Sequence, residues 1–254
     1  MLSFLPVQQS PTKWAHQRIP RRRAEYAQSF CTSNEENDQL RRSHSSRTEI
    51  QLALYQFALE VCFGLIGTDN FGDRASSIHV YSLLDLGCGN SANGSLPLMK
   101  LIPTSLAQLT IGVDLFANCS NSLAMACINC DLTRTSDQRS VQLTPFRDHV
   151  FDYIVSISFL QWLMAKNMSH VSSELLSRFS EELFRILSQP DDDDGQYGHG
   201  QCVLQFYPSG WTDVDSVCNS LFKANPKLKG CRILAQPVAN RGIKLFLYMT
   251  VSNK

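Results

Sequence analysis

The sequence contains no apolar run approaching the roughly 20 residues that a membrane-spanning helix needs. Residues 1–6 place no basic cluster ahead of a long apolar core, so no secretory signal is expected. Net charge is also absent, because 23 Lys and Arg residues balance 23 Asp and Glu residues. A neutral chain argues against autonomous, nonspecific binding of nucleic acid, which depends on the neutralisation of phosphates.

Patterns typical of metal sites are missing as well. The nine cysteines are odd in number and scattered, which favours reduced thiols in the cytosol or nucleus over a disulfide framework. Cys127 and Cys130 have C-x-x-C spacing, but residues three apart on a strand face opposite sides, and no second pair matches them. The histidines are isolated, and the acidic run at residues 191–194 lacks the alternating ligands of an EF-hand loop. No metal site is therefore expected.

What the sequence has is a polar N-terminal segment followed by alternating strand and helix patterns. Residues 1–46 combine prolines, serines, glutamines and a cluster of arginines, so they are expected to form a flexible basic segment. Residues 47–254 are expected to form one domain, with a parallel sheet that is covered by helices. The last two strand patterns are joined too tightly for a helical crossover, so they are expected to pair antiparallel.

The boundaries of these expected elements follow from apolar spacing. A helix begins at Thr48 and is ended by Gly64 and Gly67, and a later helix is capped by Thr212 or Asp213. The expected strands are residues 79–86, 109–115, 124–130, 151–158, 202–207, 232–235 and 244–251, and the other helices are residues 93–101, 173–187 and 213–224.

The most informative motif is an apolar run that ends in Asp85 and continues into the small-residue turn Gly87-Cys88-Gly89. A strand that feeds such a turn lets the backbone approach a ligand closely. A second apolar strand ends at Asp114, at the distance where an acid typically holds the ribose of a nucleotide-like cofactor. A third acid, Asp131, closes a third apolar run. Three acids at three strand ends predict a pocket along one edge of the sheet.

Asp85 helps to decide which nucleotide-like ligand fits. Dinucleotide sites use G-x-G-x-x-G, and Ala92 at the third position is a variant that some of them tolerate. An acid two residues before the first glycine faces a pyrophosphate unfavourably. It suits a ligand with an ammonium group and no phosphate, such as the methionine end of S-adenosylmethionine.

The segment Asp85-Leu86-Gly87-Cys88-Gly89 resembles motif I of class I S-adenosylmethionine-dependent methyltransferases. Residues 151–163 (FDYIVSISFLQWL) and 204–208 (LQFYP) closely resemble strand segments of the eukaryotic 18S rRNA (guanine-N7) methyltransferases. Pro145-Phe146 and parts of residues 50–60 match as well, so the resemblance covers roughly residues 47–250. It implies a Rossmann-like class I methyltransferase fold of the α/β class, with a mostly parallel seven-stranded sheet, an antiparallel last strand and helices on both faces.

The resemblance also implies roles for individual residues around S-adenosylmethionine. These are Asp85, Gly87, Cys88 and Gly89 at the methionine end, Asp114 at the ribose, Leu115, Asp131 and Leu132 around the adenine, and Ser156 and Ile157 on the floor near the reactive methyl.

The reaction implied by the resemblance needs no general base, because guanine N7 carries a lone pair and no proton. Catalysis would then rest on positioning, which can contribute roughly 7–11 kcal/mol. N7 is hidden in the narrow major groove of folded RNA, so the base must be splayed onto a stacking platform. Trp162 and Tyr207 follow the fourth and fifth strands at the expected substrate edge, with Gln161 as a hydrogen-bonding neighbour.

The implied partners are 18S rRNA within the pre-40S particle and a small zinc-binding methyltransferase activator protein. The activator would add a strand beside the third strand, which residues 124–130 suit. The implied process is rRNA processing in ribosome biogenesis, in the nucleus (nucleolus and nucleoplasm) and the cytoplasm. The basic C-terminal tail of the family is not found, so RNA contacts are expected elsewhere, with the N-terminal arginines as candidates.

Two alternatives stay open at this point. The neutral charge allows a methyltransferase that acts on a small molecule or a protein. Ser91, which stands where the family usually has a third glycine, allows a catalytically inactive ribosome assembly factor with the same fold.

Overall fold

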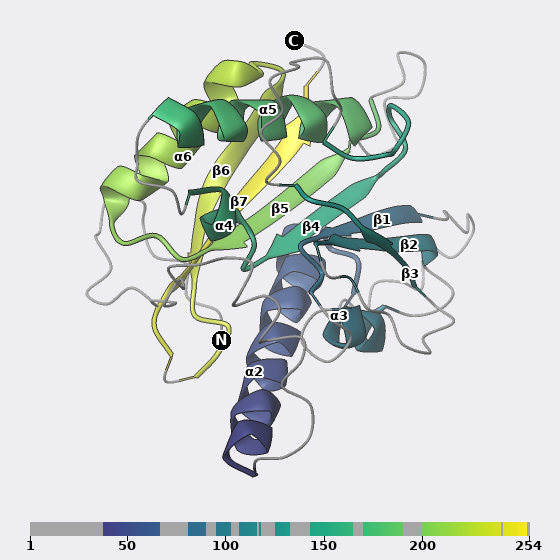
Figure 1. The fold of residues 1–254 in the computed structure, drawn as a ribbon, viewed down its shortest axis with the longest axis vertical. Coiled ribbons are helices and arrows are strands. Elements are labelled where there is room, and N and C mark those ends of the chain that lie inside the picture. The colour runs from purple at the N-terminus through teal and green to yellow at the C-terminus, as the bar shows by residue number, and fades with distance from the viewer. Residues whose placement is uncertain are drawn as a thin grey trace.

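The computed structural model describes residues 38–66, 81–89, 95–102, 107–115, 117, 125–132, 143–164, 170–189, 200–239 and 241–252. Strands and helices alternate along the chain as the sequence predicted (Figure 1). In chain order they are α2 (Asp38–Phe57), the π-helix η1 (Ala58–Cys62), β1 (Tyr81–Leu86), α3 (Ser95–Leu101), β2 (Ala107–Asp114), β3 (Ala126–Asn129), β4 (Tyr153–Ile157), α4 (Leu160–Met164), α5 (His170–Ile186), β5 (Gln201–Phe206), α6 (Trp211–Ala224), β6 (Leu228–Ala235) and β7 (Lys244–Val251).

A seven-stranded sheet with the strand order β3-β2-β1-β4-β5-β7-β6 forms the centre of the fold. β1 pairs in parallel with β2 and β4, and the pairs β2–β3 and β4–β5 are also parallel. β7 lies antiparallel to both β5 and β6. The predicted sheet, mostly parallel with an antiparallel last strand, is confirmed. The strand order reverses between β1 and β4, which makes their carboxyl ends the expected place for a ligand.

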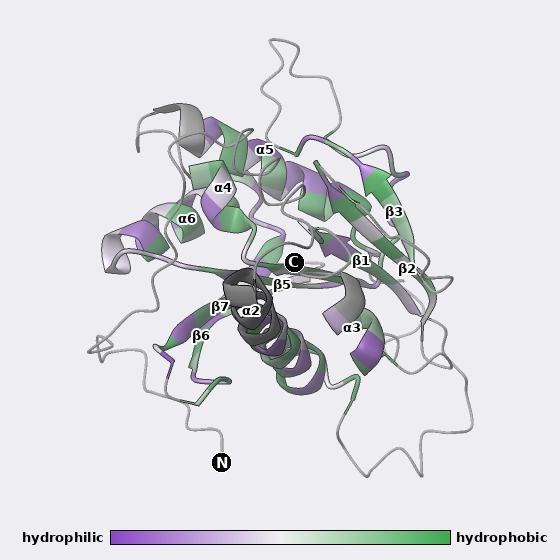
Figure 2. Cartoon of the chain, turned by 60° about the horizontal axis from the view of Figure 1, so that its bottom comes forward, coloured by the Kyte–Doolittle hydropathy of each residue, from purple (hydrophilic) through white to green (hydrophobic). Residues whose placement is uncertain are grey.

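Side chains alternate between two hydrophobic cores, one on each face of the sheet. Leu84 and Ile154 point into the core that also contains buried residues of α4, α5 and α6. Their neighbours Leu83 and Val155 point into the core that contains buried residues of α2 and α3. Helices on both faces are therefore confirmed (Figure 1). Hydrophobic and hydrophilic residues alternate around α2 and α5, as expected of helices with one buried face (Figure 2).

The first described helix is longer than predicted. α2 begins at Asp38 rather than at the predicted Thr48, so residues 38–46 lie within this helix. The reason is local, because residues 38–57 contain neither proline nor glycine and include strong helix formers such as Leu40 and Arg41. Residues 1–37 lie outside the described part of the chain.

Helix ends confirm one prediction and correct another. Gly64 follows η1 with φ of +67°, as a glycine stop predicts, whereas Gly67 lies outside the described residues. α6 begins at Trp211, with Gly210 at the N-cap and no side-chain cap, so the predicted cap by Thr212 or Asp213 is wrong. Asp213 instead accepts a 2.8 Å hydrogen bond from the amide of Ser209, the residue before the N-cap.

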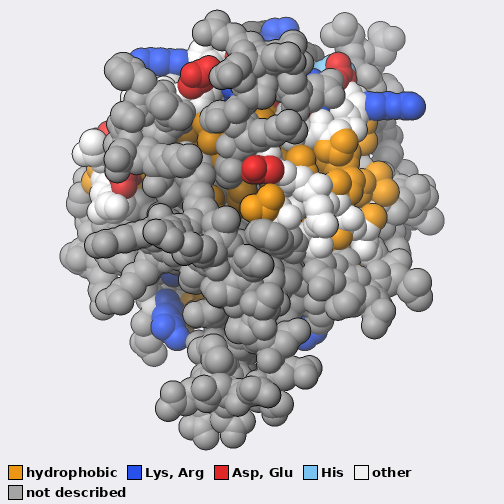
Figure 3. Space-filling view, in the orientation of Figure 1, with side chains coloured by type: hydrophobic (Ala, Val, Ile, Leu, Met, Phe, Trp, Pro, Cys, Tyr) orange, Lys and Arg blue, Asp and Glu red, His pale blue; other side chains and the backbone are white. Residues whose placement is uncertain are grey.

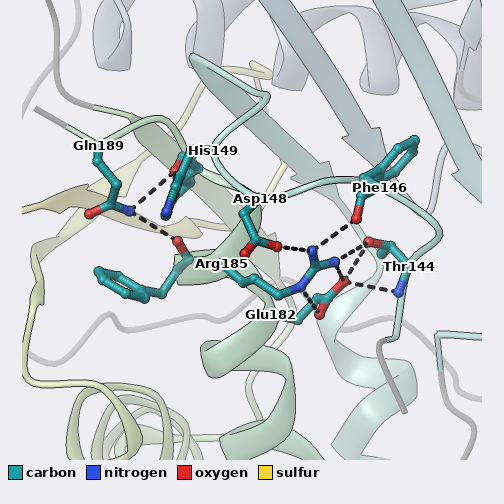
Figure 4. Close-up of polar contacts among 9 residues, drawn as sticks. Thr144, Phe146, Asp148, His149, Glu182, Arg185 and Gln189 are labelled. Atoms are coloured by element: carbon teal, nitrogen blue, oxygen red, sulfur yellow. Dashed lines mark hydrogen bonds and ion pairs between the residues drawn. The ribbon is translucent and has the colours of Figure 1, made fainter. Parts of the chain in front are cut away.

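The loop before β4 is fastened to α5 by Arg185 (Figure 4). Its guanidinium donates at 2.6 Å to both Glu182 and Asp148 and at 2.8 Å to the carbonyl oxygen of Phe146. Thr144 donates to the buried Glu182 carboxylate through its amide, at 2.9 Å, and through its hydroxyl. These contacts fix the segment that enters β4.

Cys127, in β3, is disulfide-bonded, which departs from the prediction of reduced thiols. Six further cysteines of the described chain form no disulfide, namely Cys62, Cys88, Cys130, Cys202, Cys218 and Cys231. In the portion of the chain covered by the structure, no helix has both the length and the hydrophobicity to cross a bilayer.

Candidate functional site

Asp85 is a fully buried acid in the middle of the sheet. It lies in β1, where its register partners are Gly112 of β2 and Val155 of β4. The Tyr55 hydroxyl of α2 donates a 2.7 Å hydrogen bond to Asp85 Oδ2. Within the described chain, Asp85 Oδ1 is buried without a hydrogen-bond partner. Burial raises the pKa of Asp85 to about 7, while the Tyr55 hydrogen bond lowers it and the nearby Asp114 raises it.

The turn after β1 needs glycine for two different reasons. Gly87 has φ of +78°, and a Cβ there would lie 2.5 Å from the Cβ of Phe159. Gly89 has φ of +65° but would meet nothing within 4 Å, so only its backbone conformation favours glycine. The amides of Gly87 and Cys88 donate to the Val113 carbonyl at 2.7 and 3.1 Å, which holds the turn against β2. Ser91 lies outside the described residues.

Asp114, at the end of β2, lies directly beside this turn. Its Oδ2 accepts a 3.0 Å hydrogen bond from the Gly89 amide. Leu115, the next residue, is 43% exposed. The structure therefore brings together Asp85, the glycine turn and Asp114, which the sequence assigned to one pocket.

The residues predicted around the adenine and the methyl group differ in their exposure. Asp131 is exposed just after β3, whereas the side chain of Leu132 packs into the core beneath α5. Ser156 is fully buried, and its hydroxyl donates to the Leu86 carbonyl at 2.8 Å. Ile157 is also buried, in the core beneath α2. Leu132, Ser156 and Ile157 thus support the site from behind.

Ser158 is the residue of this strand end that sequence reasoning missed. It has φ of +60°, which is uncommon for a residue other than glycine and concentrates at functional sites. Its amide and its hydroxyl both donate to Gln205 Oε1 at 3.1 Å. The side-chain amide of Gln161 donates to the Ser158 carbonyl. Gln161 is therefore a buried residue that stabilises this turn. The left-handed conformation of Ser158 has no signal in the sequence.

The two aromatic residues predicted for the acceptor lie near this turn. Trp162 is half-buried against the core beneath α5. Tyr207 is half-buried, and the Ser158 hydroxyl lies 3.5 Å from its oxygen. One face of the Tyr207 ring is covered by Lys244, whose Nζ lies 4.9 Å from the ring centroid.

Lys244 is the second residue that the sequence did not reveal. It begins β7, and it reaches the carboxyl edge of β5 because these two strands are antiparallel. It is only 6% exposed, and burial, with a contribution from Arg241, lowers the pKa of Lys244 to about 8. A lysine between apolar strand residues was its only signal.

Comparison with known proteins places this geometry in context. No family model matches the chain. It is 27% identical over 173 residues to a protein of Dictyostelium discoideum named "Probable 18S rRNA (guanine-N(7))-methyltransferase". This match covers 67% of this chain and 53% of that protein. It is 26% identical over 169 residues to the 18S rRNA (guanine-N(7))-methyltransferase bud23 of Schizosaccharomyces pombe. That match covers 66% of this chain and 56% of the S. pombe protein. The chain therefore spans about half the length of the curated relatives it matches.

A solved structure supports the fold. A chain of the structure titled "Complex between the Haloferax volcanii Trm112 methyltransferase activator and the putative methyltransferase" aligns with a TM-score of 0.51 at 12% identity, over 90% of this chain and 98% of that chain. The strand order, the antiparallel β7 and the glycine turn beside Asp114 define the class I methyltransferase fold. Within that class, the sequence relationship is to the 18S rRNA (guanine-N7) methyltransferases, as the motifs at residues 151–163 and 204–208 predicted.

Proposed function

We propose that this protein is an S-adenosylmethionine-dependent methyltransferase that methylates N7 of a guanine in 18S rRNA during biogenesis of the small ribosomal subunit. One observation carries the proposal. A buried carboxylate with an unpartnered oxygen, Asp85, lies beside a glycine turn and a second acid, within a fold and sequence lineage of methyltransferases.

The residues of the site fit S-adenosylmethionine. Asp85 Oδ1 is a buried acceptor that suits an ammonium donor, because a buried charge needs a partner of opposite sign. The turn at Gly87 and Gly89 lets the backbone come close to the ligand. Asp114, at the end of the neighbouring strand, suits ribose hydroxyls. When bound, the cofactor supplies a methyl group activated by a sulfonium centre.

The acceptor edge requires positioning rather than proton transfer. Ser158 and Tyr207 follow β4 and β5 at the same edge of the sheet as Asp85. Trp162 and the Tyr207 ring, one face of which Lys244 covers, are the proposed stacking surfaces for a splayed guanine. Such stacking is worth about 1–3 kcal/mol per base. The neutral N7 lone pair needs no base, so these residues hold the purine in line with the methyl group.

A small zinc-binding activator is the proposed protein partner, bound at the β3 edge of the sheet. β3 is the last strand on that side of the sheet. Leu109 of the neighbouring strand β2 and Leu115, which follows β2, are 41% and 43% exposed. Hydrophobic side chains gather over this end of the sheet in the space-filling view (Figure 3). Strand addition by a partner would cover both features. The partner and the pre-40S substrate together suggest activity in the nucleus, including the nucleolus and nucleoplasm, and in the cytoplasm.

Co-expression with a Trm112-type activator tests the partner. We expect a soluble heterodimer on size-exclusion chromatography and poor solubility of the chain alone. Full solubility and full activity of the isolated chain would remove the partner from the proposal.

Mapping of 7-methylguanosine in 18S rRNA tests the reaction. Cells that carry only Asp85→Ala should lose the modification, whereas cells with Asp215→Ala, a surface acid 55% exposed, should keep it. An unchanged modification in Asp85→Ala cells would point to a different acceptor if the purified wild-type complex binds S-adenosylmethionine in calorimetry. The absence of binding by that complex would favour an inactive assembly factor.

A further inference from the structure

The N-terminal helix α2 places a hydroxyl group inside the proposed cofactor site. Tyr55 is 1% exposed, and its hydroxyl donates to Asp85 Oδ2 at 2.7 Å. The two residues are 30 positions apart in the chain, and the sequence placed Tyr55 only within a helix with an apolar stripe. The contact therefore gives α2 a chemical link to the site as well as a packing role.

Packing holds Tyr55 firmly in this place. Its neighbours Leu54 and Ala58 are fully buried in the core beneath α2. The centroid of the Phe57 ring lies 4.6 Å from the centroid of the Phe246 ring on β7. The π-helix η1 follows immediately, and π-helical turns occur frequently at functional sites.

Among the described residues that face Asp85, Tyr55 is the one that favours the ionised carboxylate. Asp114, from β2, disfavours it through like charge. Burial and the two acids raise the pKa of the Cys88 thiol, from the turn, so this group stays neutral. Val155, from β4, is apolar. Burial and Asp85 raise the pKa of Tyr55 well above its ordinary value, so Tyr55 remains a neutral donor.

We propose that Tyr55 is a positioning residue of the cofactor site: it holds Asp85 as a carboxylate whose second oxygen, Oδ1, receives the ammonium group of S-adenosylmethionine. This rests on the proposed function and adds to it a coupling between the docking of α2 and cofactor affinity. Because the ammonium group binds the ionised form, affinity should fall as the pH drops below 7, and loss of the Tyr55 hydroxyl should move that fall to higher pH.

Calorimetry with S-adenosylmethionine between pH 6 and 9, on the complex with its activator, tests this coupling. The measured quantity is the ratio of the dissociation constant of Tyr55→Phe to that of the wild type. Using this ratio cancels the titration of the ligand's own amino group. We expect a ratio of about tenfold or more at pH 6, because hydrogen bonds to charged groups are worth about 1.5–3 kcal/mol. The ratio should fall steadily from pH 6 to pH 9, because Asp85 of the variant also becomes ionised as the pH rises.

Two controls make the result specific. Tyr248→Phe removes a hydroxyl that donates a 3.0 Å hydrogen bond to the Gln201 side chain on β5, away from Asp85. The ratio of its dissociation constant to that of the wild type should stay near one at every pH. Binding of 5′-methylthioadenosine, which lacks the amino-acid end, should be unchanged in Tyr55→Phe.

A ratio that is constant with pH, or equal to one throughout, would overturn the role of Tyr55 while the wild type still bound the cofactor. A wild-type complex that binds no S-adenosylmethionine would overturn the proposed function itself. Thermal unfolding of Tyr55→Phe, which keeps the ring, confirms that the variant is folded.

Discussion

A side chain on Gly87 would collide with Phe159, because its Cβ would lie 2.5 Å from the Phe159 Cβ. Gly87→Ala must also adopt φ near +78°. We expect a loss of about 2–4 kcal/mol in the free energy of unfolding, together with loss of cofactor binding. Gly64→Ala is the matched control, since φ there is +67° but nothing lies within 4 Å. It should cost only about 1–2 kcal/mol and leave binding intact. Equal losses of stability and binding in both variants, from urea denaturation and calorimetry, would contradict this reading.

The buried charge of Asp85 should lower the stability of the ligand-free protein. Burial raises the pKa of Asp85 to about 7, above its value of about 4 in an unfolded chain, so the folded state binds more protons between these pH values. Stability therefore falls as the pH rises through this interval. Asp85→Asn keeps an acceptor for Tyr55 and removes the charge. We therefore expect its free energy of unfolding, from urea denaturation, to exceed that of the wild type by ~2–4 kcal/mol at pH 8. The gain should shrink by more than half at pH 5, and a gain independent of pH would show that the charge is not its cause.

The contacts of Arg185 should contribute strongly to stability. Arg185→Met leaves the carboxylate of Glu182 buried without its cation, at a side-chain exposure of 7%. We expect a loss of about 3–5 kcal/mol in urea denaturation, the usual cost of breaking a buried pair. Adding Glu182→Gln to this variant should recover part of the loss, because the unpaired charge is then gone. Arg232→Met breaks the more exposed pair with Asp215 and should cost less than about 1 kcal/mol. Similar costs for the two arginine variants would be the contrary outcome.

Trp162 should serve the acceptor rather than the cofactor. We expect Trp162→Ala to lower the rate of 18S rRNA methylation about 5- to 150-fold, since stacking on the base contributes about 1–3 kcal/mol. Affinity for S-adenosylmethionine should stay within about twofold. Trp211→Ala removes another half-buried tryptophan that packs against the same core, and so it matches the loss of packing. Loss of methylation in both variants would mean that packing alone explains the effect.

Much of the fold follows from local sequence patterns. The strand that contains Asp85, its glycine turn and the strand that ends at Asp114 were all expected, and the structure places them side by side. The start of α2 and the cap of α6 were not predicted, because several polar residues fit either a helix or a loop and only the final backbone chooses between them.

By itself, the sequence determined the alternation of strands and helices and the acids at the strand ends, because apolar periodicity and turn chemistry act over a few neighbouring residues. Tertiary structure alone decided that Tyr55 bonds to Asp85, that Lys244 covers Tyr207 and that Ser158 is left-handed. Each of these depends on which distant segments become neighbours in the sheet and its covering helices. That choice reflects the packing of the whole chain, and no short stretch of residues encodes it.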